Sequence, residues 1–143
     1  MEPRSIPHIF VVDDERAIAS SLTAILNMSG YKARFFINPV AALEAARKDQ
    51  PDLLISDVVM PELSGVDLAI QLKEKCPSCK VLLFSGQAAT ADLLQEARER
   101  GYSFEMLSKP VHPQALLARI KHLNTSAVSY VCADRPGAAH LEI

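Results

Sequence analysis

The sequence predicts an α/β fold, in which helices cover both faces of an open, doubly wound sheet of five parallel strands. Short apolar runs, typical of strands buried on both faces, alternate with longer segments of helical periodicity. Polar residues, three of them acids, stand directly after several of these runs. Because the carboxyl ends of parallel strands share one edge of a sheet, we expect these polar residues to meet there.

The composition restricts the class of protein. The chain has 143 residues, of which 49% are hydrophobic and 22% charged, as expected for one globular domain and not for a disordered chain. A net charge of −2 argues against direct DNA binding. No apolar run is long enough for a membrane span, and residues 1–7 lack the apolar core of a signal peptide. With only three cysteines, we expect reduced thiols and a cytoplasmic protein with no membrane contact.

The first strand and helix are predicted with clear limits. After a lead-in at residues 1–7, the apolar run 8–12 predicts a buried strand. It ends on acids, of which Asp14 can cap the following helix. Apolar residues at helical spacing then continue to Gly30, and residues 31–36 alternate weakly as a second strand.

A second helix and a third strand follow. Asn38 is an N-cap with proline behind it at the first helical position, and Pro51 closes this helix. We expect its inward side chains to be Val40, Leu43 and Ala46. Residues 53–56 form a third, buried strand that leads directly into Asp57, and Pro61 prevents a regular continuation.

The second half repeats the alternation. Helical spacing over 66–75 precedes an apolar strand at 80–84, and a polar helix over 90–100 precedes a strand at 103–107. A last helix begins at His112 or Pro113 and ends at Leu123, with Leu116, Leu117 and Ile120 as its buried stripe.

The strand ends supply a set of side chains with related chemistry. The first strand ends at Asp13 and Asp14, the third at Asp57, the fourth at Ser85 and the fifth at Lys109. Neighbouring carboxylates need a counter-charge, and oxygen ligands of this kind suit Mg²⁺. A metal, an ammonium and a hydroxyl around one carboxylate are suited to stabilise a phosphoryl group. Asp57 is then the candidate nucleophile, because carboxylates can form aspartyl phosphates.

These motifs, taken together, resemble the receiver domain of two-component response regulators. The matching segments are residues 11–15, residues 56–65, Ser85 with Gly86, and Ser108 to Pro110, within a resemblance that covers about residues 7–123. The resemblance implies a flavodoxin-like (CheY-like) fold with strand order 2-1-3-4-5. It also implies a phosphorelay protein that is not a turnover enzyme.

By this resemblance, Asp57 accepts a phosphoryl group from a sensor histidine kinase, a histidine phosphotransfer protein or a small phosphodonor. Asp14, Asp57 and the backbone carbonyl of Val59 would bind Mg²⁺ directly, and Asp13 mainly through water. Ser85 and Lys109 would hold the phosphoryl oxygens. Their shift would rearrange the face of the fourth helix, fifth strand and fifth helix, through which a downstream protein binds.

Two residues depart from the family pattern. Met106 stands at the switch position that usually holds an aromatic residue, so a coupling from Ser85 to an aromatic side chain is in doubt. Val59 stands two residues after Asp57 and cannot orient an attacking water by hydrogen bonding. We therefore expect slow self-dephosphorylation.

Other interpretations stay open at this level. The chain could be a receiver-fold docking module that is never phosphorylated, or a receiver excised from a longer hybrid kinase or regulator. An aspartyl phosphatase would need a second acid at position 59, where valine stands. Cys76 and Cys79 follow a helix C-terminus, which disfavours a thiolate, and are expected to be plain loop cysteines.

The organisation expected is a lead-in at 1–7, a receiver domain at 8–123 and a tail at 124–143. The tail is too short for a DNA-binding effector domain. Within it, residues 127–132 alternate briefly and could form an extra edge strand or a homodimer contact.

Overall fold

The computed structural model describes residues 6–86, 90–109 and 112–132, with 90, 91 and 124–132 described by their backbone alone. The chain forms two compact units, residues 1–111 and 112–143. The strands are β1 His8–Val12, β2 Lys32–Phe36, β3 Leu53–Asp57, β4 Lys80–Ser85 and β5 Glu105–Ser108. The helices are α1 Arg16–Met28, α2 Pro39–Lys48, α3 Gly65–Lys75, α4 Thr90–Glu99 and α5 Pro113–Cys132.

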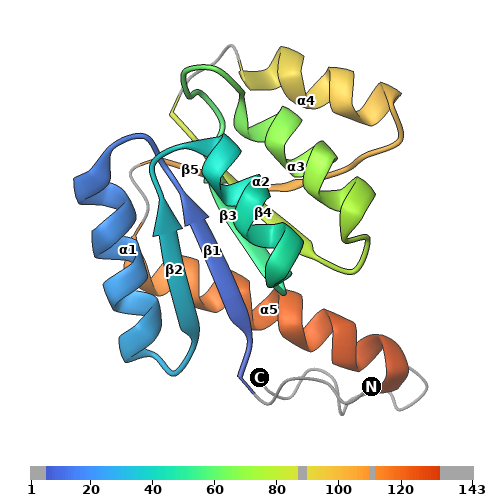
Figure 1. The fold of residues 1–143 in the computed structure, drawn as a ribbon. Helices are drawn as coiled ribbons and strands as arrows, with labels where there is room; N and C mark the ends of the chain where they lie inside the picture. The colour runs from blue at the N-terminus through green and yellow to red at the C-terminus, as the bar shows by residue number, and fades with distance from the viewer. Residues whose placement is uncertain (1–5, 87–89, 110–111, 133–143) are drawn as a thin grey trace. The chain divides into compact units, whose positions relative to one another are not determined.

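The five strands form one parallel sheet in the order β2-β1-β3-β4-β5, which confirms the predicted topology. In Figure 1, β1 and β2 run side by side in the same direction, and their carboxyl ends lie at the same edge of the sheet. The register pairs Val12 with Ser56 across β1 and β3, and Asp57 with Phe84 across β3 and β4. The central strands therefore end side by side.

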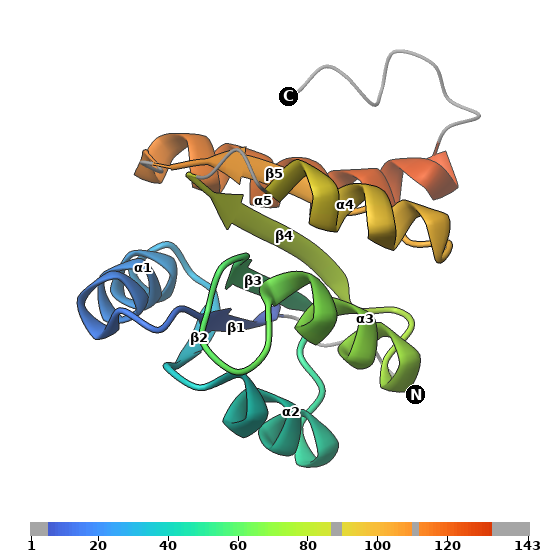
Figure 2. The same cartoon turned by 90° about the horizontal axis from the view of Figure 1, so that it is seen from above.

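The central strands β1, β3 and β4 are buried on both faces, as the apolar runs predict, whereas the edge strands β2 and β5 are partly exposed. Figure 2 shows α1 on one side of the sheet and α2, α3 and α4 on the other. Alternate residues of the central strands, such as Phe10, Leu54 and Leu83, pack in one core with buried side chains of these three helices. The residues between them, such as Val11 and Ile55, are also buried and point to the opposite face.

Helices α1 to α4 follow the predicted segments closely, but the inward face predicted for α2 contains an error. Asn38 caps α2 through its side chain, which accepts hydrogen bonds from the amides of residues 40 and 41. Val40, however, is 49% exposed. The buried positions are Pro39, Ala42 and Ala46, spaced three and four residues apart. Val40 lies off this stripe, so the spacing of positions along the helix predicts burial better here than the apolar character of the residue.

The second unit contains α5. Leu116 and Ile120 are buried and Leu117 is half-buried, in agreement with the predicted stripe. The helix continues to Cys132, beyond the predicted end at Leu123, so the extra strand suggested for residues 127–132 is wrong. No glycine or proline lies between Pro113 and Pro136, and nothing in the sequence therefore interrupts the helix.

Two further boundaries bear on the predictions. β5 begins at Glu105, two residues later than expected. In the part of the chain that the structure describes, no helix is long and apolar enough to cross a membrane.

Candidate functional site

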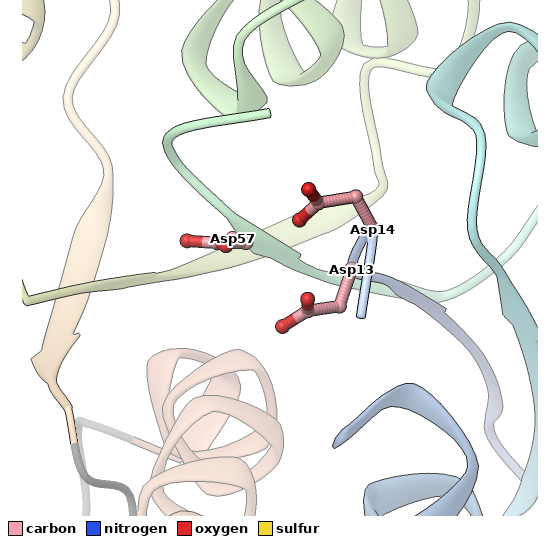
Figure 3. A group of neighbouring side chains, drawn as sticks. All are labelled: Asp13, Asp14 and Asp57. Atoms are coloured by element: carbon pink, nitrogen blue, oxygen red, sulfur yellow. The ribbon is translucent and has the colours of Figure 1, made fainter. Parts of the chain in front are cut away.

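The acids predicted at the strand ends meet in space. Asp13 and Asp14 follow β1 directly, and Asp57 is the last residue of β3. One carboxylate oxygen of each lies within 4.8 Å of the others. In Figure 3 the three carboxylates point to the same side of the sheet edge. Such a group of negative charges is unfavourable without a cation nearby.

Lys109 supplies a positive charge at this place. Its ammonium lies 3.1 Å from Oδ2 of Asp57 and 3.7 Å from Oδ2 of Asp13. The backbone amide of Lys109 donates to the carbonyl of Ser85, which fixes the residue after β5 to the end of β4. Burial disfavours the ammonium, but the hydrogen bond to Asp57 and the charges of Asp13 and Asp57 outweigh it and raise the pKa of Lys109.

Asp13 is the most buried of the three acids, with 1% of its surface exposed. Its Oδ1 accepts a hydrogen bond from the amide of Glu15, at 2.9 Å. Among the described residues its Oδ2 has no hydrogen-bond partner, because the Lys109 ammonium at 3.7 Å makes an ion pair at most. Burial is the main reason why the pKa of Asp13 is raised; Glu15 and Lys109 oppose this shift.

The turn after β1 differs from the prediction in one respect. Asp14 does not cap α1: the N-cap residue is Glu15, whose side chain makes no capping hydrogen bond. Asp14 is exposed and faces the acidic group instead. The residue is therefore available as a ligand.

A cavity of about 390 Å³ adjoins these side chains, and its lining residues are Asp14, Glu15, Asp57, Val59, Gly86 and Lys109. This volume exceeds that of several water molecules and leaves room for a small hydrated ligand. Sequence reasoning missed Glu15 and Gly86 as lining residues. The sequence holds a signal for both residues: Glu15 belongs to the acidic run at 13–15, and Gly86 directly follows the predicted site residue Ser85.

The remaining predicted residues take three different positions. Val59 lines the cavity, and its side chain is 45% exposed. Ser85 is buried at the last position of β4, one residue before the cavity-lining Gly86. Met106, opposite Leu83 in the register of β4 and β5, is 36% exposed.

The donor set fits a hard divalent cation. It consists of carboxylate oxygens, one of which is buried without a hydrogen-bond partner among the described residues. Ions such as Mg²⁺ prefer oxygen ligands and keep some of their water, for which the cavity has space. The arrangement joins a candidate cation site to a carboxylate, Asp57, that also contacts an ammonium.

Comparisons with known proteins agree with this geometry. Residues 9–121 match the response regulator receiver domain family. The chain is 33% identical over 115 residues to the response regulator MprA of Mycobacterium leprae, which covers 80% of this chain and 50% of that protein. It is 32% identical over 115 residues to the transcriptional regulatory protein CreB of Escherichia coli, with 80% and 49% covered.

Among solved structures, a response regulator receiver domain protein from Clostridium thermocellum is similar, with a TM-score of 0.73 and 28% identity. The match covers 82% of this chain and 93% of that chain. The chain spans about half the length of the curated relatives it matches.

Proposed function

The chain belongs to the response regulator receiver domain family, and on that premise we propose that it acts as a phosphoacceptor in a two-component phosphorelay, with Asp57 as the acceptor. Receiver domains are signalling modules and not turnover enzymes. The single observation that carries the proposal is the contact of Asp57 with Lys109 beside a cluster of three acids.

The chemistry is a transfer to a carboxylate oxygen. A bond forms between an Asp57 oxygen and phosphorus, and the bond from phosphorus to the leaving group breaks. The leaving group, a histidine imidazole of the kinase or acetate from acetyl phosphate, departs with the electron pair. We assign the attack to Oδ1, because Oδ2 already accepts a hydrogen bond from the Lys109 ammonium. Lys109 is also close enough to stabilise charge on the transferred group.

Asp14, Asp57 and the Val59 carbonyl would hold Mg²⁺, with Asp13 contributing through water. When bound, Mg²⁺ would neutralise charge on the acids and on the phosphoryl oxygens. The Oδ2 of Asp13, which accepts no hydrogen bond from the described residues, and the cavity next to Val59 support this assignment. Ser85 is proposed as the hydroxyl that bonds to a phosphoryl oxygen, together with Lys109.

Intact-protein mass after incubation with acetyl phosphate and Mg²⁺ tests the proposal. We expect one phosphoryl adduct that needs Mg²⁺, disappears in Asp57→Ala and remains in Asp67→Ala, which changes an exposed acid of α3. Absence of an adduct from the folded wild-type protein, together with absence of beryllofluoride binding, would refute it. That result would favour the docking module that is never phosphorylated.

The partners belong to the same proposal. A sensor histidine kinase or a histidine phosphotransfer protein would supply the phosphoryl group, in the cytoplasm. As the family resemblance implies, a downstream protein would bind through residues of α4, β5 and α5, and a second copy of the chain is the alternative partner. The exposed Met106 on β5 supports an apolar contact there. Since a methionine adapts its shape readily, the response to phosphorylation would be graded repacking and not an aromatic flip.

A further inference from the structure

Ser56, the residue before the proposed acceptor, is a polar side chain in an apolar layer. It is 0% exposed, and the residues two before and two after it, Leu54 of β3 and Val58 just beyond the strand, both lie in the core. A buried hydroxyl is costly unless it is hydrogen-bonded. The Ser56 hydroxyl donates to the backbone carbonyl of Asp57, at 2.9 Å.

The same carbonyl is confined from another side by Gly65, the first residue of α3. A Cβ atom on Gly65 would lie 2.0 Å from the Asp57 carbonyl oxygen and 3.0 Å from the Ser56 hydroxyl oxygen. Only glycine therefore allows the start of α3 to approach the end of β3 this closely. The Asp57 carbonyl lies in a slot with the Ser56 hydroxyl and the bare Gly65 Cα as walls.

Two backbone hydrogen bonds hold the next residue of this loop. The amide of Val58 donates to the carbonyl of Phe84, at 3.0 Å, and the amide of Gly65 donates to the carbonyl of Val58, at 2.7 Å. Val59, whose carbonyl is a proposed metal ligand, follows immediately. The backbone of residues 57 and 58, which leads from the Asp57 carboxylate to the Val59 carbonyl, is thus held by β4, by the start of α3 and by the Ser56 hydroxyl.

We propose that Ser56 is a positioning residue for the site: its hydroxyl, with the bare Cα of Gly65, fixes the Asp57 peptide and thereby the Asp57 carboxylate and the Val59 carbonyl. Ser56 acts through the backbone, since alternate side chains of a strand point to opposite faces and Ser56 cannot face the cavity side with Asp57. The role in phosphorylation rests on the proposed function, whereas the role in cation binding can be measured without it.

The test is Ser56→Ala, which removes the hydroxyl without adding volume. The matched control is Thr23→Val, because the buried Thr23 hydroxyl also donates to a backbone carbonyl, that of Ala19, at 2.8 Å within α1. Both variants lose one buried hydroxyl–carbonyl bond, and only one of these bonds is at the site. Gly65→Ala is a stronger perturbation and a poorer test, since the Asp57 carbonyl must move to admit the methyl group and the fold itself is disturbed.

Two readouts are compared at a temperature where both variants are folded. At saturating Mg²⁺, Ser56→Ala should acquire the acetyl phosphate adduct about tenfold more slowly than wild type, because small misplacements of reacting groups have large effects on rate. Its Mg²⁺ dissociation constant, from the Mg²⁺ dependence of thermal unfolding, should rise severalfold. Thr23→Val should match wild type in both, even where its thermal stability falls equally.

The outcomes separate the two proposals. Wild-type values for Ser56→Ala in both readouts, or losses equal to those of Thr23→Val, would overturn the positioning role. If the wild-type protein forms no adduct, the proposed function fails, and Mg²⁺ affinity alone decides the positioning role. A weakened Mg²⁺ affinity confined to Ser56→Ala would then still support it.

Discussion

Replacement of Asp13 by asparagine tests the charge balance of the site. The variant keeps the size of the side chain and an oxygen that can accept the Glu15 amide, and it removes one buried negative charge. We expect the metal-free protein to become more stable, although a native contact is lost. The reason lies in the relative size of three terms.

The repulsion of Asp13 by the other acids is at least as large as its attraction to Lys109. With an effective dielectric constant of about 20, repulsion from Asp57, which lies within 4.8 Å, amounts to at least about 3.5 kcal/mol. The exposed Asp14, screened as in water and within the same limit, adds about 1 kcal/mol. Attraction to the Lys109 ammonium at 3.7 Å is about 4.5 kcal/mol. What remains is the cost of burying the charge, which the hydrogen bond from the Glu15 amide offsets only in part.

Removing that cost raises the free energy of unfolding by about 1–3 kcal/mol. The polar amide of asparagine beside the Lys109 ammonium reduces this increase, so we expect the free energy of unfolding to rise by about 1 kcal/mol in total. For a chain of this length such a gain raises the unfolding temperature by roughly 3–4 °C. The assay is thermal unfolding in EDTA and in increasing Mg²⁺. Mg²⁺ should stabilise wild type progressively and Asp13→Asn much less, because stabilisation follows the ratio of ligand concentration to dissociation constant.

Glu44→Gln is the control, since it removes one exposed negative charge of α2. It should leave both the stability in EDTA and the response to Mg²⁺ close to those of wild type. A less stable Asp13→Asn protein in EDTA would refute the charge argument. An undiminished response to Mg²⁺ would remove Asp13 from the cation site.

Three further predictions concern other side chains. Lys109→Met leaves Asp13 and Asp57 without the ammonium that pairs with them, and in EDTA it should lower the free energy of unfolding by about 1–3 kcal/mol. Urea denaturation measures this change. An unchanged free energy of unfolding would mean that the ion pairs are not maintained in solution. The phosphorylated protein should persist for minutes or longer, because apolar Val59 lines the cavity, and Val59→Thr should shorten its life severalfold by intact mass; decay of wild type within seconds would contradict this. Burial chiefly raises the pKa of Cys79 from 9.0 to about 12, so the unfolded chain loses this proton first as pH rises. Stability should therefore fall between about pH 9 and 12, by about 1.4 kcal/mol per pH unit, and Cys79→Ala should lack this component of the slope in denaturation at each pH.

The sequence was informative where physical constraints are strict. Apolar runs buried on both faces end sharply at Asp13, Asp57 and Lys109, and parallel strands bring those ends to one edge. The convergence of these residues could be predicted without coordinates. The identity of the N-cap of α1 could not, because Asp14 and Glu15 are both acids and the choice depends on the direction in which the chain leaves β1.

Other errors arose where the local pattern is weak. The sequence predicts the inward face of α2 wrongly at Val40, since a short alanine-rich helix has few large apolar residues to define a stripe. It predicts the end of α5 at Leu123, where the apolar stripe ends, although no helix breaker stands there. A change of pattern is a weaker signal for a boundary than a glycine or a proline.

At the end of β3, the residues on the two faces of the strand have different roles. Asp57 points into the acidic cavity, and the residue before it points into the core beneath. An apolar residue at position 56 would fill the core equally well but could not bond to the Asp57 carbonyl. The period of two thus allows adjacent residues to act on one functional group from opposite sides, one through chemistry and one through backbone geometry. A search for site residues confined to side chains that line the cavity would miss the second kind, and Ser56 lies outside that lining for this reason.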